Sequence, residues 1–105
     1  MAAPMHHIQF MPKLIQYLRE HELIYTVRKY RLSNAVVTVT GTDIRCQREF
    51  IGEILAYKEL EPFVCNSGFA SLGDWSGMID RFIRGDDMYL YRVVVIGKTN
   101  EGSTG

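Results

Sequence analysis

Three stretches with the pattern of β-strands follow one another in the first half of the chain, at about residues 24–28, 35–40 and 51–57. Tyr25 and Val27 alternate with Thr26 and Arg28, and β-branched residues dominate the second stretch. The stretches are linked by short turn-forming segments, and no helix-length segment separates the first from the second. Strands joined in this way pair antiparallel, whereas a doubly wound α/β fold needs a crossover helix after each strand.

The flanking segments predict an α+β order of elements. A short strand is expected at residues 6–10, a helix at 11–21 with Pro12 in its first turn, and a short helical turn at 58–62. A second helix is expected at 71–85 and a last strand at 88–96. These elements predict a small, mostly antiparallel β-barrel or sheet with helices packed against it.

The second predicted helix has clear end signals. Ser71 is the expected N-cap, Asp74 its weaker capping-box partner, and Gly85 the terminator. Its inner face is predicted to carry four large apolar residues: Trp75, Ile79, Phe82 and Ile83.

Composition favours one domain. The 105 residues are 47% hydrophobic, which is enough for a single core, and residues 1–97 are expected to form it. The polar, glycine-containing residues 98–105 are expected to be a disordered tail. Twelve basic and twelve acidic side chains cancel, so no global field directs the protein to a polyanion. A monomer is expected.

The two cysteines, Cys46 and Cys65, form no metal-binding pattern with histidines, so neither a metal nor another cofactor is predicted. The start of the chain lacks the features of a signal peptide, and no run approaches the ~20 apolar residues of a membrane span. A cytoplasmic protein with free thiols and no membrane partner is therefore expected.

Charge is distributed unevenly despite the balance. Residues 13–31 carry five basic and two acidic side chains, and the segment TVRKYR, at residues 26–31, combines cations with a tyrosine. Guanidinium and ammonium groups neutralise phosphate, and an aromatic face stacks on an unpaired base. The segment therefore predicts binding of single-stranded nucleic acid, although an exposed strand end with solubilising charges has the same composition.

Patterns of other functional sites are weak. All three histidines are early in the chain, there is no nucleophile elbow, and no glycine-rich stretch has the spacing of a phosphate-binding loop. For Gly68 and Gly77 we expect a turn or close helix packing.

The order of elements and three local segments resemble the ASCH domain family of the PUA-like superfamily. The segments are IYTVR at 24–28, CNSGFASLGDWSGMIDRFIRG at 65–85 and MYLYRVVVIG at 88–97, and the resemblance covers roughly residues 8–97. It implies a PUA-like barrel and a role with RNA or a free nucleotide.

The family motif GxKxxExR can be aligned position by position. Arg28 matches its arginine and Thr26 its glutamate position, which some members fill with threonine, but Leu23 stands at the lysine and His21 at the glycine. Relatives that hydrolyse acetylated cytidine use the lysine, the threonine and a later glutamate, and the corresponding CNSGF region has no carboxylate. Catalysis is therefore disfavoured, since Leu23 cannot take part in proton transfer.

The resemblance also implies a cleft between the first helix and the barrel. Tyr25 and Val27 are expected to face the barrel interior, while Thr26, Arg28 and Tyr30 alternate onto the cleft side. The predicted nucleic-acid-binding residues are Arg19, Thr26, Arg28, Lys29, Tyr30 and Arg31.

Phe69 and Trp75 are possible stacking surfaces near the predicted cleft, with the core the preferred place for Trp75. Two alternatives to RNA or nucleotide binding stay open. One is an enzyme, a ribonuclease or the amidohydrolase, with Thr26 and Tyr30 as catalytic candidates. The other is a protein-interaction module that uses exposed Tyr89 and Tyr91.

Overall fold

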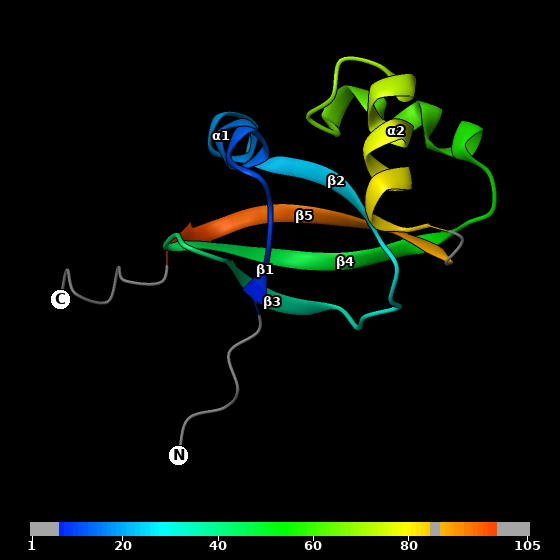
Figure 1. Cartoon of the computed structure of the whole chain (residues 1–105). Coiled ribbons are helices and arrows are strands. Elements are labelled where there is room, and N and C mark those ends of the chain that lie inside the picture. Colours follow the sequence, from blue (N-terminus) through cyan, green and yellow to red (C-terminus); the bar gives the residue numbers. More distant parts are fainter. Residues whose placement is uncertain (1–6, 85–86, 99–105) are drawn as a thin grey trace, which may run out of the picture.

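A computed structural model describes residues 7–84 and 87–98 of the chain. It shows a small α+β fold in which a five-stranded mixed sheet curls into a half-barrel flanked by helices (Figure 1). The elements in chain order are β1 (His7–Ile8), α1 (Pro12–His21), β2 (Leu23–Arg28), β3 (Ala35–Val39), β4 (Ile44–Ile54), η1 (Tyr57–Asn66), α2 (Leu72–Phe82) and β5 (Met88–Lys98). The α+β class and the helices flanking the sheet were predicted correctly.

The strand order is β1-β3-β4-β5-β2. Three of the four pairings are antiparallel, and the short β1 pairs parallel with β3. A direct turn between β2 and β3 was the expectation, and it is wrong, because β2 pairs with β5 and lies at the edge opposite β1. Residues 29–34, which we call the crossing segment, therefore span from β2 at one edge to β3 on the far side of β4 and β5.

The change from helix to strand occurs at Glu22, as the sequence predicted. Glu22 caps α1 in the left-handed conformation (φ 64°), and its N–H donates to the carbonyl of Leu18. Its own carbonyl accepts a hydrogen bond from the Val95 N–H in β5. One residue thus ends the helix and starts the pairing of β2 with β5.

Both faces of the sheet carry core. On the α1 face, Leu14 and Leu18 of the helix pack with Ile24, Cys46 and neighbouring strand residues. On the α2 face, a second cluster joins Val27, Leu90 and the helix and η1 residues Trp75, Ile79 and Leu60. Since both faces are covered, the expectation that Thr26 lines an open cleft is wrong: Thr26 is 9% exposed.

Helix α2 begins at the predicted cap but ends earlier than predicted. The Asp74 N–H donates to the Ser71 hydroxyl at 3.1 Å, and Ile83 is the C-cap. Phe82 is 70% exposed, so its assignment to the inner face is wrong. The buried stripe follows Trp75, Ile79 and Ile83, and each step of four advances it by about 40°, which leaves Phe82 at the edge of the final turn.

Strand boundaries differ most around Gly52. The strand predicted at 51–57 is the end of β4, which begins at Ile44, and the predicted turn at 58–62 lies within η1. The register of β4 against β5 shifts between Phe50 and Gly52, so the glycine marks a β-bulge in a long strand. Lys98 belongs to β5 rather than to a tail; Gly85 and residues 99–105 lie outside the described residues.

None of the described helices is long and apolar enough to cross a membrane. Within residues 7–84 and 87–98, His, Cys, Asp and Glu side chains form no cluster of three that could hold a metal ion.

Candidate nucleic-acid interface

Arg28 ends β2 at the open side of the half-barrel. Its Nη2 donates to the carbonyl of Gln9 at 2.9 Å, and its guanidinium lies 5.0 Å from the centre of the Phe10 ring. Gln9 follows β1, which is the opposite edge of the sheet. Arg28 therefore bridges the two edges that a closed barrel would pair, and its Nε is buried without a hydrogen-bond partner.

A second arginine lies on the same face. Arg48 in β4 is only 6% exposed; its Nε and Nη2 donate to the carbonyl of Ser33 at 3.2 and 2.8 Å. Its guanidinium lies 5.9 Å from the centre of the Tyr91 ring, and Tyr91 pairs with Thr26 next to Arg28. We call Arg28 and Arg48 the arginine pair.

Among residues 7–84 and 87–98, the arginine pair has no acidic partner. All the protein hydrogen bonds that the two side chains donate go to neutral carbonyls. The one ion pair among the described residues joins Arg92 to Glu49 elsewhere in the sheet. Burial, and then the charge of Arg48, lower the pKa of Arg28 to about 10, against a smaller opposing effect of Tyr91. The site therefore holds uncompensated positive charge at neutral pH.

The crossing segment covers this face beside α1. The Tyr91 hydroxyl donates to the carbonyl of Tyr30 at 2.7 Å and accepts from the Leu32 N–H. Near its end, the Asn34 Oδ1 accepts from the Phe50 N–H at 2.8 Å. These contacts, with those of Arg48 to Ser33, hold the middle and end of the segment to β4 and β5.

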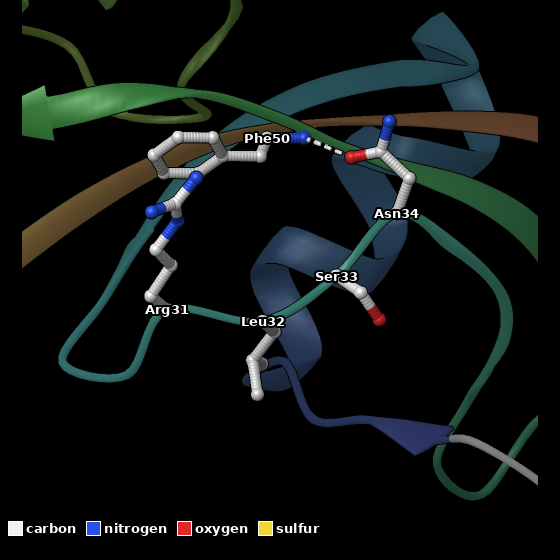
Figure 2. Close-up of a pocket in the computed structure, with 5 residues that line it drawn as sticks. All are labelled: Arg31, Leu32, Ser33, Asn34 and Phe50. Atoms are coloured by element: carbon white, nitrogen blue, oxygen red, sulfur yellow. Dashed lines mark hydrogen bonds between the residues drawn. The ribbon is translucent and has the colours of Figure 1, made fainter.

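A pocket lies between the crossing segment and β4. Figure 2 shows its lining, which comprises Arg31, Leu32, Ser33, Asn34 and Phe50. The guanidinium of Arg31 lies 4.8 Å from the centre of the Phe50 ring. A planar cation and an aromatic ring thus meet at a surface that solvent reaches.

Five of the six predicted nucleic-acid-binding residues lie in β2 or in the crossing segment. Arg28 is at the site, with Thr26 buried beside it. Lys29, Tyr30 and Arg31 are exposed in the crossing segment. The placement of Tyr30 on the strand face with Thr26 is wrong, because β2 ends at Arg28. The Tyr30 ring is instead 63% exposed and lies 5.2 Å from the Lys29 Nζ.

Arg19 is exposed in the last turn of α1. Within the described part of the chain its side chain makes no hydrogen bond, ion pair or ring contact that would join it to the arginine pair. The structure therefore does not bring Arg19 together with the other predicted residues by any contact.

The core position preferred for Trp75 is confirmed, whereas the exposure predicted for Tyr89 and Tyr91 needs correction. Trp75 is 2% exposed in the core under α2, so it offers no stacking surface, and Phe69 is half-buried with the Lys13 Nζ 4.7 Å from its ring centre. Tyr91 is fully buried rather than exposed, and Tyr89 is half-buried. The strand pattern could not distinguish these two tyrosines, since both fit a pleated surface.

Sequence reasoning missed Arg48, Asn34 and Phe50. A weak signal existed for Arg48, because it follows Ile44 and Cys46 at a spacing of two, and both are buried on one face. Asn34 and Phe50 gave no signal, since their contact joins a loop to a strand sixteen residues later.

Comparison with protein-family models, with curated proteins and with solved structures finds no match to this chain.

Proposed function

We propose that the protein binds single-stranded RNA or a free nucleotide at the crossing segment, with a phosphate held by Arg28. The observation that carries the proposal is the arginine pair, whose two buried or half-buried guanidinium groups have no carboxylate partner in the part of the chain that the structure describes. A phosphate offers both the negative charge and the acceptor oxygens that this pair lacks.

Two neighbouring features favour a nucleotide over a simple anion. Lys29 and Arg31 add exposed positive charge beside Arg28, as the backbone of a polyanion requires. Phe50 and Tyr30 add aromatic surface for bases. The resemblance of the sequence to ASCH domains, whose fold is a PUA-like barrel, points the same way.

Binding is tested by fluorescence anisotropy of short labelled single-stranded RNA and DNA, titrated at several salt concentrations. Wild type should bind with salt-dependent affinity, and Arg28→Met should weaken binding about tenfold or more and reduce the salt slope. Arg28→Lys should fall between them, because it keeps the charge but loses the planar fork.

Arg45→Met is the matched control. Arg45 is an exposed arginine of β4, three residues from Arg48 and on the other face of the sheet. Its replacement by methionine changes the net charge by the same amount as Arg28→Met. Unchanged affinity and salt slope in Arg28→Met, with circular dichroism showing a folded protein, would reject the site. Chromatography of RNA and acetylated cytidine after incubation separates binding from turnover.

A further inference from the structure

Phe50 lines the pocket of Figure 2, and Tyr89 and Tyr91 pack against its ring. We call these three residues the aromatic wall, and the phosphate-binding role does not use them. The Phe50 ring meets the Tyr91 ring edge-on, with centroids 5.6 Å apart, and the Tyr89 ring at a tilt, with centroids 6.2 Å apart. Two tyrosines of β5 therefore fix the orientation of the Phe50 ring. The ring also lines the pocket that the crossing segment encloses.

Among the described residues, the guanidinium of Arg31 covers the Phe50 ring on the pocket side. Arg31 lies over it at 4.8 Å, on a long side chain from an exposed loop, whereas the other three lining residues are Leu32, Ser33 and Asn34. The guanidinium is planar, so a planar group already occupies this side of the ring. Stacking of a base on an aromatic ring is stronger than an exposed cation–π contact, so a base can displace it.

The ring is also next to the arginine pair. Tyr91 contacts Phe50 on one side and the guanidinium of Arg48 on the other, at 5.9 Å. Arg31, once displaced, is three residues from Arg28 and able to reach the same phosphate backbone. A phosphate subsite and a flat aromatic subsite thus adjoin through one shared tyrosine.

We infer that Phe50 is the base-stacking platform of the site: one unpaired base of the bound strand or nucleotide takes the place of the Arg31 guanidinium on the Phe50 ring. This inference rests on the proposed function and narrows its ligand to one with an unpaired base. Duplexes and base-free polyphosphates lack that group and should bind less tightly.

The test uses a short single strand with one 2-aminopurine, whose fluorescence falls on stacking, and a matched strand with an abasic site there. Wild type should quench the probe and bind it roughly tenfold more tightly than the abasic strand. Phe50→Leu should lose both effects and keep salt-dependent binding of the abasic strand, whereas Phe50→Trp should retain quenching.

Phe82→Leu is the control, since Phe82 is exposed at the end of α2 and the substitution is the same. Equal binding of both strands by wild type overturns the inference, and so does unchanged quenching in Phe50→Leu. If Phe50→Leu does not fold, the comparison of the two strands on wild type decides. Binding of neither strand, or no loss in Arg28→Met, rejects the proposed function instead.

Discussion

Arg28 illustrates how a single side chain can be costly to the fold and useful to a ligand. Its guanidinium lies over the Phe10 ring and Nη2 donates to the Gln9 carbonyl, but its Nε is buried and unsatisfied. A bound phosphate would satisfy that nitrogen and neutralise the charge. Arg28 is therefore expected to stabilise the ligand-free fold only weakly, and the stability of the protein is expected to depend strongly on bound anions.

The stability of Arg28→Met tests whether the buried charge of Arg28 destabilises the fold. On folding, burial lowers the pKa of Arg28 to about 10, which corresponds to a penalty on the order of 3 kcal/mol for keeping it charged. We expect the free energy of unfolding of Arg28→Met at pH 7, from urea titration, to lie at or above the wild-type value. The lost Gln9 contact offsets part of the gain.

The pH dependence has a definite sign. The folded pKa of Arg28 is below the unfolded one, so the penalty is full below pH 10 and declines as pH rises from about 10 toward the unfolded pKa. Its contribution to stability therefore increases across that window, and Arg28→Met should lack this component.

A loss of more than about 2 kcal/mol in the free energy of unfolding of Arg28→Met at pH 7 would mark Arg28 as a structural residue.

Gly68 is a residue at which glycine is required. It has φ +85°, and a Cβ there would lie 2.5 Å from the Leu14 Cδ2. We expect Gly68→Ala to lower the free energy of unfolding by on the order of 2 kcal/mol or more, measured by urea titration. Gly77 is the control: it is exposed in α2, and a Cβ there meets nothing within 4 Å. Gly77→Ala should raise stability by about 1 kcal/mol, and equal effects at both positions would contradict the packing.

At the scale of elements, the crossing segment is the part of the chain that the topology requires and local patterns hide. Its residues fit a turn, so the sequence predicted a hairpin between β2 and β3. Two strands, β4 and β5, lie between them instead. The segment must then cross the sheet, and side chains beneath it supply the hydrogen bonds that a hairpin would have formed internally.

Tyr91→Phe removes one of these anchors without changing the ring. We expect a loss of about 1–2 kcal/mol in the free energy of unfolding. Hydrogen exchange at the Leu32 amide should become faster, because in the wild type this N–H donates to the Tyr91 hydroxyl. Tyr89→Phe in the same strand is the control, since the Tyr89 hydroxyl lies 3.4 Å from the Asp87 carboxylate and, within the described residues, makes no hydrogen bond to the crossing segment. Equal exchange at Leu32 in both variants would show that the segment is held in another way.

At the scale of the whole molecule, the two cysteines report on different parts of the fold. Cys46 is fully buried in the cluster under α1, and burial raises its pKa to about 11, whereas Cys65 is exposed at the end of η1. Thiolate is the reactive form, so a native sample at pH 8 should show one fast and one slow thiol with a chromogenic disulfide reagent.

The slow phase should accelerate with urea in parallel with global unfolding, because Cys46 lies at the centre of the sheet. Cys65→Ser should abolish the fast phase alone. Two fast thiols in the wild type would be inconsistent with the buried position of Cys46.

The elements with a strong local period were predictable from the sequence. The apolar stripe of α1, the cap of α2, the alternation in β2 and β5 and the break at Glu22 all follow from the geometry of one segment, which its own residues report. The start of β4 at Ile44 was not predicted. The basic segment at 26–31 also placed Arg28 among the expected binding residues, and its contact with a ligand stays a prediction.

Only the tertiary structure decided which strands are neighbours and, through that, what the site contains. The pairing of β2 with β5 brings Tyr91 beside Thr26, and the pairing of β5 with β4 brings Arg48 and Phe50 to the same face. These contacts join residues tens of positions apart, and their energy depends on burial that no local pattern encodes. The sequence by itself thus determined the elements and one arginine, whereas the arginine pair and the aromatic wall exist only because the sheet orders its strands in this way.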